Sequence, residues 1–243
     1  MGKIVVLVGQ SGAGKTTIAS ELHPEDGYIA SCEILRAEVA RRGLEDTHEN
    51  IHTVGMDFQN SDPPWQGARV LEASKDVPFF VFDGPRTPTD IEFLQESSRD
   101  VEVVGIYADR KIRYRRIFER EGTPITREHF MTRCIDEVVE AGLNDCLRKA
   151  NIYLFNNRTS LPAIREYSKT FWTDLKNDRI PQSELYGLSE DDDMETFEGK
   201  LRHISFKTTS SPKVCELMRN YFNNEESQLK EYRANKLHIE VFI

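Results

Sequence analysis

A glycine-rich loop near the N-terminus has the residue types and spacing of a phosphate cradle. It runs from Gly9 to Thr16 in the pattern Gly-x-x-x-x-Gly-Lys-Thr, with no position missing. Glycines let the backbone curl so that successive N–H groups point at phosphate oxygens, and the dipole of the following helix adds positive potential. We expect Lys15 to reach the β- and γ-phosphates of a nucleoside triphosphate and the Thr16 hydroxyl to ligate Mg²⁺. The residues predicted to contact the nucleotide are Gly9, Ser11, Gly12, Ala13, Gly14, Lys15, Thr16 and Thr17.

The segments on both sides of this loop are those that a phosphate-binding loop requires. The apolar run Ile4–Val8 precedes it and has the composition of a strand buried on both faces. A helix is predicted to follow over Lys15–Leu22, ended by His23-Pro24. A chance match on a glycine turn is the alternative interpretation, and this flanking pattern argues against it.

A carboxylate follows the second apolar run of the chain. Val77–Phe82 is predicted as a buried strand, and Asp83-Gly84-Pro85 comes directly after it. Ligands bind at the carboxyl ends of strands in parallel sheets, so Asp83 is predicted to hold the Mg²⁺ shell, usually through water. It is also the one obvious candidate for a base toward a hydroxyl acceptor. The alternative is a turn-forming Asp-Gly without a role in binding.

A strongly basic helix is predicted over Lys111–Arg120. At 100° per residue, Arg113, Arg116 and Arg120 fall within about 60° of each other, beside the apolar stripe, whereas Arg115 points away. Such a cluster could clamp a polyphosphate and neutralise the charge that develops during phosphoryl transfer. The alternative is a solvated basic helix paired with nearby acidic residues.

Predicted strands alternate with predicted helices along the first 176 residues. Besides the segments above, strands are predicted at Val101–Tyr107 and Ile152–Phe155. The remaining helices are predicted at Ser31–Arg42, Thr47–Gln59, Trp65–Ser74, Pro88–Glu96, Arg127–Glu140 and Leu161–Leu175. This alternation is typical of an α/β fold, here a doubly wound, mostly parallel sheet with flanking helices.

The composition changes after residue 178. Residues 1–178 are predicted as one domain, residues 179–194 as an exposed acidic linker, and residues 195–243 as a small C-terminal α+β appendage of unknown role. The appendage is predicted to contain strands at His203–Lys207 and Lys236–Ile243 around a helix at Pro212–Phe222. It could dimerise, cover the site or bind a partner.

The charge and the cysteines restrict the classes of protein. A net charge of −9 makes binding to duplex nucleic acid unexpected, because that requires a basic surface. The four cysteines lack the spacing of a zinc site or a redox pair, and fit reduced thiols in a cytoplasmic protein. No apolar run has the length of a signal peptide or a membrane span, so no membrane association is expected.

Several short segments resemble known kinases. Ile34-Leu35-Arg36-Ala37-Glu38-Val39 is similar to the acceptor-site helix of adenylate-kinase-like nucleoside monophosphate kinases, and Asp83-Gly84-Pro85-Arg86-Thr87 is similar to their Asp-Gly-Phe-Pro-Arg stretch without the aromatic residue. The longer pattern Glu33–Asn50 looks closer still to P-loop kinases related to dephospho-CoA kinase, best known from archaea. The basic helix, Phe130–Glu137 and Ala150–Asn156 add to this likeness.

The resemblance covers roughly residues 1–176 and assigns roles to further arginines. It implies that Arg36 and Arg86 bind the acceptor phosphate and that Arg113, Arg116 and Arg133 are the cations on the lid side. The alternatives are a surface arginine on an amphipathic helix for Arg36 and a loop arginine for Arg86. The chain departs from adenylate kinases in its short lid, Gly122–Arg127, and its cysteine spacing excludes a zinc-bearing lid.

Together these residues predict a phosphotransferase that uses ATP with Mg²⁺ and a small nucleotide-like acceptor. A nucleoside monophosphate is the first candidate for that acceptor. A hydroxyl acceptor of the dephospho-CoA type is one alternative. A second is a nucleotide-binding switch or slow NTPase that acts through the C-terminal segment, and a homodimer is possible. The Asn-Lys-x-Asp motif that GTPases use to read guanine does not occur. The negative charge also argues against an RNA-processing kinase.

Overall fold

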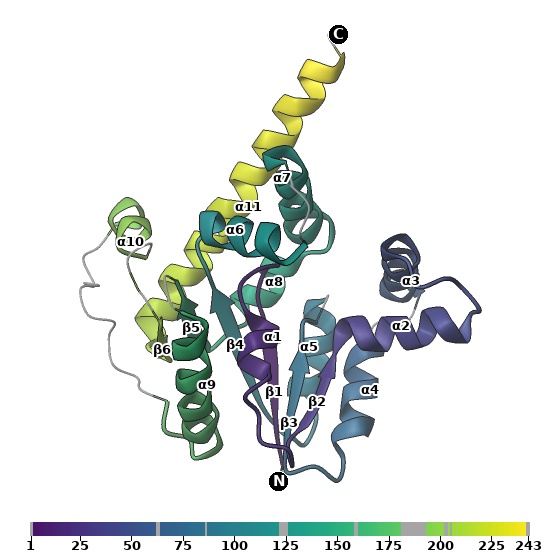
Figure 1. Cartoon of the computed structure of the whole chain (residues 1–243), viewed down its shortest axis with the longest axis vertical. Coiled ribbons are helices and arrows are strands. Elements are labelled where there is room, and N and C mark those ends of the chain that lie inside the picture. Colours follow the sequence, from purple (N-terminus) through teal and green to yellow (C-terminus); the bar gives the residue numbers. More distant parts are fainter. Residues whose placement is uncertain are drawn as a thin grey trace.

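The computed structural model describes residues 2–61, 64–85, 87–121, 126–157, 160–180, 193–201, 204 and 206–241. One sheet of six strands forms its centre (Figure 1). The strands are β1 (Lys3–Val8), β2 (Gly27–Ala30), β3 (Phe79–Asp83), β4 (Asp100–Tyr107), β5 (Ile152–Asn156) and β6 (Phe206–Thr209). Their order in the sheet is β2-β3-β1-β4-β5-β6, and only β6 is antiparallel to its neighbour. The predicted doubly wound, mostly parallel sheet is confirmed.

The central strand β1 is buried on both faces because helices cover both sides of the sheet. Ile4, Val6 and Val8 belong to one apolar cluster and Val5 and Leu7 to the other, as the alternation of side chains along a strand requires. The cluster with Val5 and Leu7 is closed by α1 (Lys15–Ala19) and α9 (Leu161–Lys176). The cluster with Ile4 is closed mainly by α4 (Trp65–Ser74), α5 (Pro88–Gln95), α8 (Leu143–Arg148) and α11 (Pro212–Val241). The continuous apolar run of β1 follows from this double burial.

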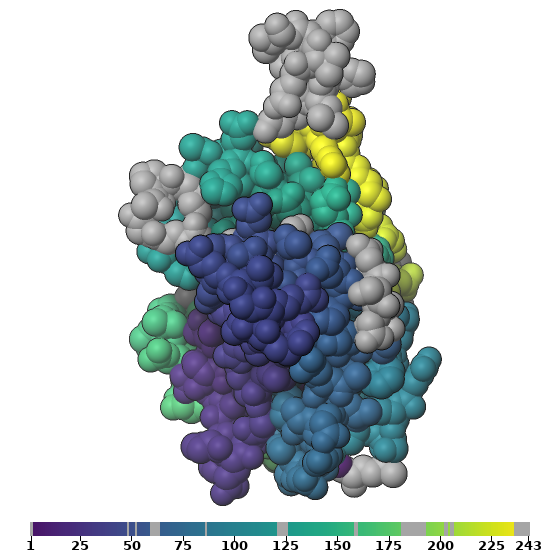
Figure 2. All heavy atoms as spheres, turned by 90° about the vertical axis from the view of Figure 1, so that its right-hand side faces the viewer, coloured from purple at the N-terminus to yellow at the C-terminus, as the bar shows by residue number. Residues whose placement is uncertain are grey.

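The remaining helices connect or cover the strands. They are α2 (Ser31–Arg41), α3 (His48–Ser61), α4 (Trp65–Ser74), α5 (Pro88–Gln95), α6 (Arg110–Glu121), α7 (Arg127–Ile135), the π-helix η1 (Asp136–Glu140), α8 (Leu143–Arg148), α10 (Met194–Leu201) and α11 (Pro212–Val241). The helices predicted over the first 176 residues are all present, with ends shifted by a few residues. Figure 2 shows the face formed by α2 to α5, coloured dark blue to blue, with α7 in teal above it.

The predicted strand at Lys236–Ile243 is wrong. The helix α11 continues to Val241, and its far end projects beyond the rest of the molecule in Figure 1. The alternation of Leu237, Ile239 and Val241 has the period of a strand. However, the first half of α11 is held in the core by Val214, Leu217, Met218 and Phe222, and helix propagation then adds one hydrogen bond for each further residue.

The described elements after residue 193 pack on the same sheet as β1, the strand before the glycine-rich loop. β6 pairs with β5 through Tyr153↔Thr209 to Asn156↔Phe206. It begins three residues later and ends two residues later than the strand predicted at His203–Lys207. Phe197 and Leu201 of α10 belong to the same apolar cluster as Ile4, Val6 and Val8 of β1. The division of the chain at residues 178 and 195 stays a prediction, and most of the acidic linker lies outside the described residues.

The helices and the cysteines of the described residues bear on two predictions from the sequence, the lack of a membrane span and the presence of reduced thiols. None of the helices described is long and apolar enough to cross a membrane. The four cysteines are free thiols, with Cys32 exposed and Cys134, Cys146 and Cys215 buried.

Candidate phosphate-binding site

The glycine-rich loop joins the carboxyl end of β1 to the start of α1, at the middle of the sheet (Figure 1). Gly12 and Gly14 have φ values of 81° and 104°, the left-handed region in which a Cβ is strained. A Cβ on Gly12 would lie 2.8 Å from the backbone oxygen of Arg113, and one on Gly14 would collide with Nδ2 of Asn156. Glycine is therefore required at both positions because of conformation and because α6 and β5 approach the loop closely.

The carbonyl side of the loop is held by hydrogen bonds from α6 and β5. Arg116 donates from Nη1 to the oxygens of Gly12 (3.2 Å) and Ala13 (3.3 Å), and from Nη2 to the backbone oxygen of Asn156 (3.0 Å). Asn156, fully buried, donates from Nδ2 to the oxygen of Ala13 at 2.7 Å. Arg113 donates from Nη1 to the oxygen of Ser11 at 3.5 Å.

These contacts set the direction of the loop's N–H groups. In a trans peptide, the carbonyl oxygen of one residue and the N–H of the next point in opposite directions. Because the carbonyls of Ser11 and Ala13 face α6 and β5, the N–H groups of Gly12 and Gly14 point to the other side of the loop. Such a set of backbone donors is an anion-binding arrangement.

Lys15 and Asp83 lie together at the carboxyl ends of two neighbouring strands. β1 and β3 pair in parallel with Leu7 opposite Asp83, so the loop after β1 passes beside the end of β3. Lys15 donates to the oxygen of Gly9 at 2.6 Å, and its Cε would lie 3.6 Å from a Cβ built on Gly84. The positive charge of Lys15 lowers the pKa of Asp83. Asp83 thus lies at the end of the strand beside the loop, and its role in holding Mg²⁺ stays a prediction.

The Asp83 carboxylate is buried and only partly satisfied. Its Oδ2 accepts a hydrogen bond from the hydroxyl of Tyr28 at 3.0 Å, whereas its Oδ1 is buried without a partner in the described structure. Burial raises the pKa of Asp83, and Lys15 and Tyr28 lower it in part. Burial and the charge of Asp83 also raise the pKa of Tyr28, so this hydroxyl stays a donor.

These residues fit a magnesium ion bound together with phosphate. Mg²⁺ keeps several waters and is usually held by one or two protein oxygens plus substrate phosphates. The unpartnered Oδ1 of Asp83 and the exposed Thr16 at the start of α1 are oxygens of that kind. Within the described residues, no group of three or more His, Cys, Asp or Glu could hold a metal without the phosphates.

The kinase resemblance also assigned roles to two acceptor-side arginines, Arg36 and Arg86, and to the lid-side Arg133. Arg36 is on α2, about half exposed, with its Nε 3.4 Å from Oδ1 of Asp46. Arg86 lies outside the described residues. Arg133 is on α7 and partly buried. Their roles in binding the acceptor or closing over it stay predictions.

Arg113 and Arg116 lie behind the loop, on its carbonyl side. Arg113 is fully buried, donates from Nε to the oxygen of Ala108 at 3.2 Å, and lies 5.7 Å from the ring centre of Phe130. Burial alone would lower the pKa of this guanidinium, but nearby groups, including Glu225 and Glu137, raise it. Burial, followed by the charge of Arg115, lowers the pKa of Arg116. Whether either arginine also reaches a phosphate stays a prediction.

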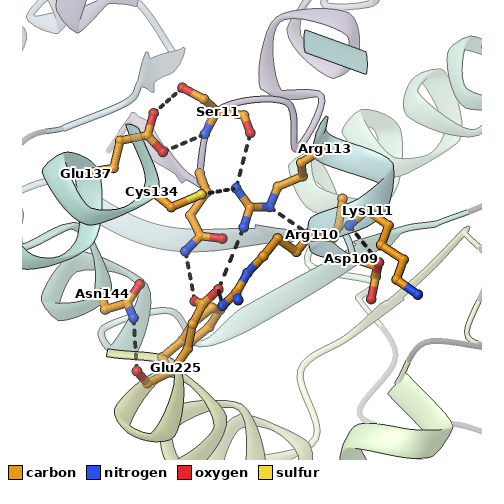
Figure 3. Close-up of polar contacts among 12 residues, drawn as sticks. Ser11, Asp109, Arg110, Lys111, Arg113, Cys134, Glu137, Asn144 and Glu225 are labelled. Atoms are coloured by element: carbon orange, nitrogen blue, oxygen red, sulfur yellow. Dashed lines mark hydrogen bonds and ion pairs between the residues drawn. The ribbon is translucent and has the colours of Figure 1, made fainter. Parts of the chain in front are cut away.

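Two carboxylates that sequence reasoning did not select also contact the loop (Figure 3). Glu137, on the π-helix η1, accepts hydrogen bonds from the backbone N–H of Ser11 at 3.0 Å and from its hydroxyl. Glu225, on α11, accepts one from Nε2 of Gln10 at 2.8 Å. π-Helices are frequent at functional sites, but they have no simple sequence signal. No local pattern marks Glu225, which is 215 residues from Gln10.

A cavity of about 1540 Å³ lies beside this network, between α6, α7, α10 and α11. Tyr107, Arg110, Tyr221, Glu225 and Tyr232 are among the residues that line it. Its lining combines aromatic rings with charges of both signs, so it does not indicate one class of ligand.

Comparison with known proteins places the chain in a family. No family model matches it. A UPF0200 protein from Methanopyrus kandleri is 30% identical over 174 residues, which cover 67% of this chain and 85% of that protein. The chain belongs to the UPF0200 family. Another UPF0200 protein, from Aeropyrum pernix, is 29% identical over 161 residues, covering 65% of this chain and 86% of the relative. The UPF0200 chain described above thus has about a third of its length outside either match.

Solved structures of two small-molecule kinases match this UPF0200 chain, each with a TM-score below 0.5. A gluconokinase from Sinorhizobium meliloti 1021 has a TM-score of 0.46 and 17% identity, covering 73% of this chain and 94% of that one. A shikimate kinase from Bacteroides thetaiotaomicron has a TM-score of 0.47 and 17% identity, covering 72% and 98%. The structure itself contains the two features that the P-loop kinase resemblance implied, the glycine-rich loop directly after β1 and the mostly parallel sheet.

Proposed function

We propose that the chain is an ATP-dependent phosphotransferase that moves the γ-phosphoryl group of ATP to a small nucleotide-like acceptor. A nucleoside monophosphate is the first candidate for that acceptor. The observation that carries the proposal is the meeting of Lys15 and Asp83 beside the loop, at the ends of β1 and β3. A phosphate cradle alone only binds. A cation and a partly satisfied carboxylate beside it are the groups that a transfer reaction uses.

The loop residues would bind the triphosphate through backbone donors. The N–H groups of Gly12 and Gly14 would contact phosphate oxygens, and Lys15 would leave the Gly9 oxygen to reach the β- and γ-phosphates. Thr16 and Asp83 would hold Mg²⁺, directly or through water, and that ion would neutralise charge on the transferred group. Catalysis would come mostly from positioning and from electrostatic stabilisation.

The acceptor would lie between α2 and the end of β3. Arg36 on α2 and Arg86 after β3 would bind its phosphate, as the resemblance to monophosphate kinases implies. The Arg36–Asp46 contact is long and exposed, so exchanging Asp46 for a phosphate costs little. A phosphate acceptor is already ionised, and it needs no strong base.

A hydroxyl acceptor of the dephospho-CoA type is the second candidate. One observation favours it: burial raises the pKa of Asp83 and leaves its Oδ1 without a partner. A carboxylate in that state is a better proton acceptor than an exposed one, and a hydroxyl nucleophile has a proton to give up. Asp83 would then accept the proton as the hydroxyl attacks.

A thermal-shift screen tests the proposal and separates its versions. The wild-type chain is melted with Mg²⁺ and, in turn, ATP, GTP, a panel of nucleoside monophosphates, and dephospho-CoA. Ligands of the native state raise the melting temperature by mass action. We expect a shift with ATP and a second, additive shift with one acceptor. A triphosphate shift without any acceptor shift would favour a nucleotide-binding switch, and no triphosphate shift would contradict the proposal.

A further inference from the structure

The C-terminal helix α11 places a carboxylate against the phosphate-binding loop. Glu225 is only 4% exposed, although it lies on the helix that projects from the body of the molecule. Its Oε2 accepts a hydrogen bond from Nε2 of Gln10 at 2.8 Å. Gln10 is the second residue of the loop, and the contact joins the two ends of the chain.

The other carboxylate oxygen of Glu225 meets two arginines of α6 (Figure 3). Oε1 is 3.2 Å from Nη2 of Arg110 and 3.7 Å from Nη2 of Arg113. Arg113 in turn donates to the Ser11 oxygen at 3.5 Å. Glu225 thus reaches the loop by two routes, directly through Gln10 and indirectly through Arg113.

The buried charge of Arg113 requires the carboxylate of Glu225 to stay beside it. Arg113 is 1% exposed, and a buried guanidinium is costly unless a counter-charge compensates it. Removing one partner of a buried ion pair leaves an uncompensated charge, so the remaining groups must rearrange. The group that would have to move is the one that holds the Ser11 carbonyl.

The position of Glu225 is fixed by the packing of α11 on α8. One turn before it, the oxygen of Phe222 accepts a hydrogen bond from Nδ2 of Asn144 at 2.9 Å, and the Phe222 side chain is in the core. One residue after it, Glu226 pairs with Arg148 of α8 at 3.0 Å. The contacts of α11 with α8 therefore hold the Glu225 carboxylate in place beside the loop.

We infer that Glu225 is a positioning residue of the nucleotide site, through which α11 sets the backbone of Gln10 and Ser11 and the guanidinium of Arg113. The inference rests on the proposed binding of a nucleoside triphosphate at this loop. It assigns a role to the C-terminal segment, which sequence reasoning left open. Glu225 touches no phosphate in this account; it acts on the loop that does.

The matched pair Glu225→Gln and Glu226→Gln tests the inference. Both replace a carboxylate by an amide on the same helix, but Glu226 contacts Arg148 and Lys230 instead of the loop. The dissociation constant of MgADP and the KM for ATP are measured for each. We expect Glu225→Gln to raise both by about tenfold or more and Glu226→Gln to leave both within about twofold. Equal nucleotide affinity in Glu225→Gln and wild type, even with a lower melting temperature, would show a structural role alone and overturn the inference.

A second readout does not depend on nucleotide binding. Hydrogen exchange of the amides in residues 9–14 is followed in the apo proteins, because exchange reports local opening of the loop. We expect faster exchange in Glu225→Gln than in wild type, and no change in Glu226→Gln. Wild-type protein that binds no nucleotide would defeat the proposed function, whereas unchanged exchange in Glu225→Gln would defeat the inference.

Gln10→Ala covers the case in which Glu225→Gln fails to fold. It removes the direct contact but keeps both arginines opposite Glu225. We expect it to weaken MgADP binding severalfold and to speed exchange of the loop amides. Where Glu225→Gln does fold, the double variant Gln10→Ala/Glu225→Gln should lose affinity by less than the product of the two single effects, since the two residues share one contact. Multiplicative effects, or a Gln10→Ala variant like the wild type, would overturn the inference.

Discussion

Arg116 donates a hydrogen bond from Nη1 to the carbonyl oxygen of Gly12 over 3.2 Å, from behind the phosphate-binding loop. The same guanidinium binds Ala13 and Asn156, so one side chain ties α6, the loop and the end of β5 together. The arginine thereby supports the loop from its carbonyl side, and its charge lies under the position proposed for the phosphates.

Arg116→Ala should weaken nucleotide binding, and Arg115→Ala is its control on the same helix. Arg115 is mostly exposed and pairs only loosely with Glu119, at 3.7 Å. Loss of Arg116 removes the donor to the partly buried carbonyl of Gly12, whereas Ala13 keeps the one from Asn156. An unsatisfied carbonyl costs roughly 1–3 kcal/mol, or about one to two orders of magnitude in affinity. Calorimetric titration with MgADP measures the effect. Comparable losses in the two variants would mean that only the net charge of α6 matters.

Gly12→Ala and Gly43→Ala separate backbone strain from collision. Both glycines have positive φ, 81° and 68°, but a Cβ on Gly43 meets nothing within 4 Å, whereas one on Gly12 would press on the Arg113 backbone. We expect Gly43→Ala to lower the free energy of unfolding by about 1–2 kcal/mol without a change in MgADP affinity. Gly12→Ala should abolish detectable binding. Binding retained by Gly12→Ala would indicate that the loop shape is not required.

Arg36→Ala tests the acceptor side, with Arg165→Ala as the control. The two arginines are similarly exposed and form ion pairs of similar length, with Asp46 at 3.4 Å and Glu21 at 3.5 Å. Arg165 lies on α9, which covers the face of the sheet opposite to α11. We expect Arg36→Ala to raise the acceptor's KM about tenfold or more and the KM for ATP less than about twofold. Steady-state kinetics with both substrates varied would show it, and equal effects on both KM values would reject the assignment.

Glu38→Gln should change the acid stability of the chain. Hydrogen bonds from Arg41, and then those from Arg42, hold the pKa of Glu38 down to about 2 and outweigh its burial, which would raise it. A depressed carboxyl pKa stabilises the fold above the unfolded value, here 4.5, and this contribution is lost as the pH falls toward 2. Denaturant titrations between pH 6 and pH 2.5 should therefore show a shallower loss of stability in Glu38→Gln than in wild type. Glu119→Gln, at an exposed site on α6, should follow the wild-type curve.

The sequence predicted those features of the site that depend on neighbouring residues. The Gly9–Thr16 loop, the buried strand before it and Asp83 after β3 are local patterns, and the parallel sheet then brings them together. The strand β2 was missed because it has only four residues, begins with Gly27 and is only partly buried at the edge of the sheet. The hydrogen bond from Tyr28 of this strand to Asp83 was missed with it.

Contacts that depend on tertiary packing could not be predicted. Glu225 and Gln10 are 215 residues apart, and nothing near Glu225 distinguishes it from the other acidic residues of α11. The basic helix shows the same limit. Its arginines were predicted beside the buried face, but the helical angle alone does not tell whether Arg113 faces a lid or a loop carbonyl.

The most direct test of the account compares wild type and Lys15→Ala for transfer of the γ-phosphoryl group. Each protein is incubated with MgATP labelled in the γ-phosphate, and with nucleoside monophosphates or dephospho-CoA in turn, and the labelled products are separated. Lys15 is the charge that the account places on the β- and γ-phosphates, so its loss should reduce transfer about a hundredfold or more. We expect ATP-dependent labelling of one acceptor by the wild type and nearly none by Lys15→Ala. Equal labelling by both proteins, or no labelled acceptor with the wild type, would contradict it.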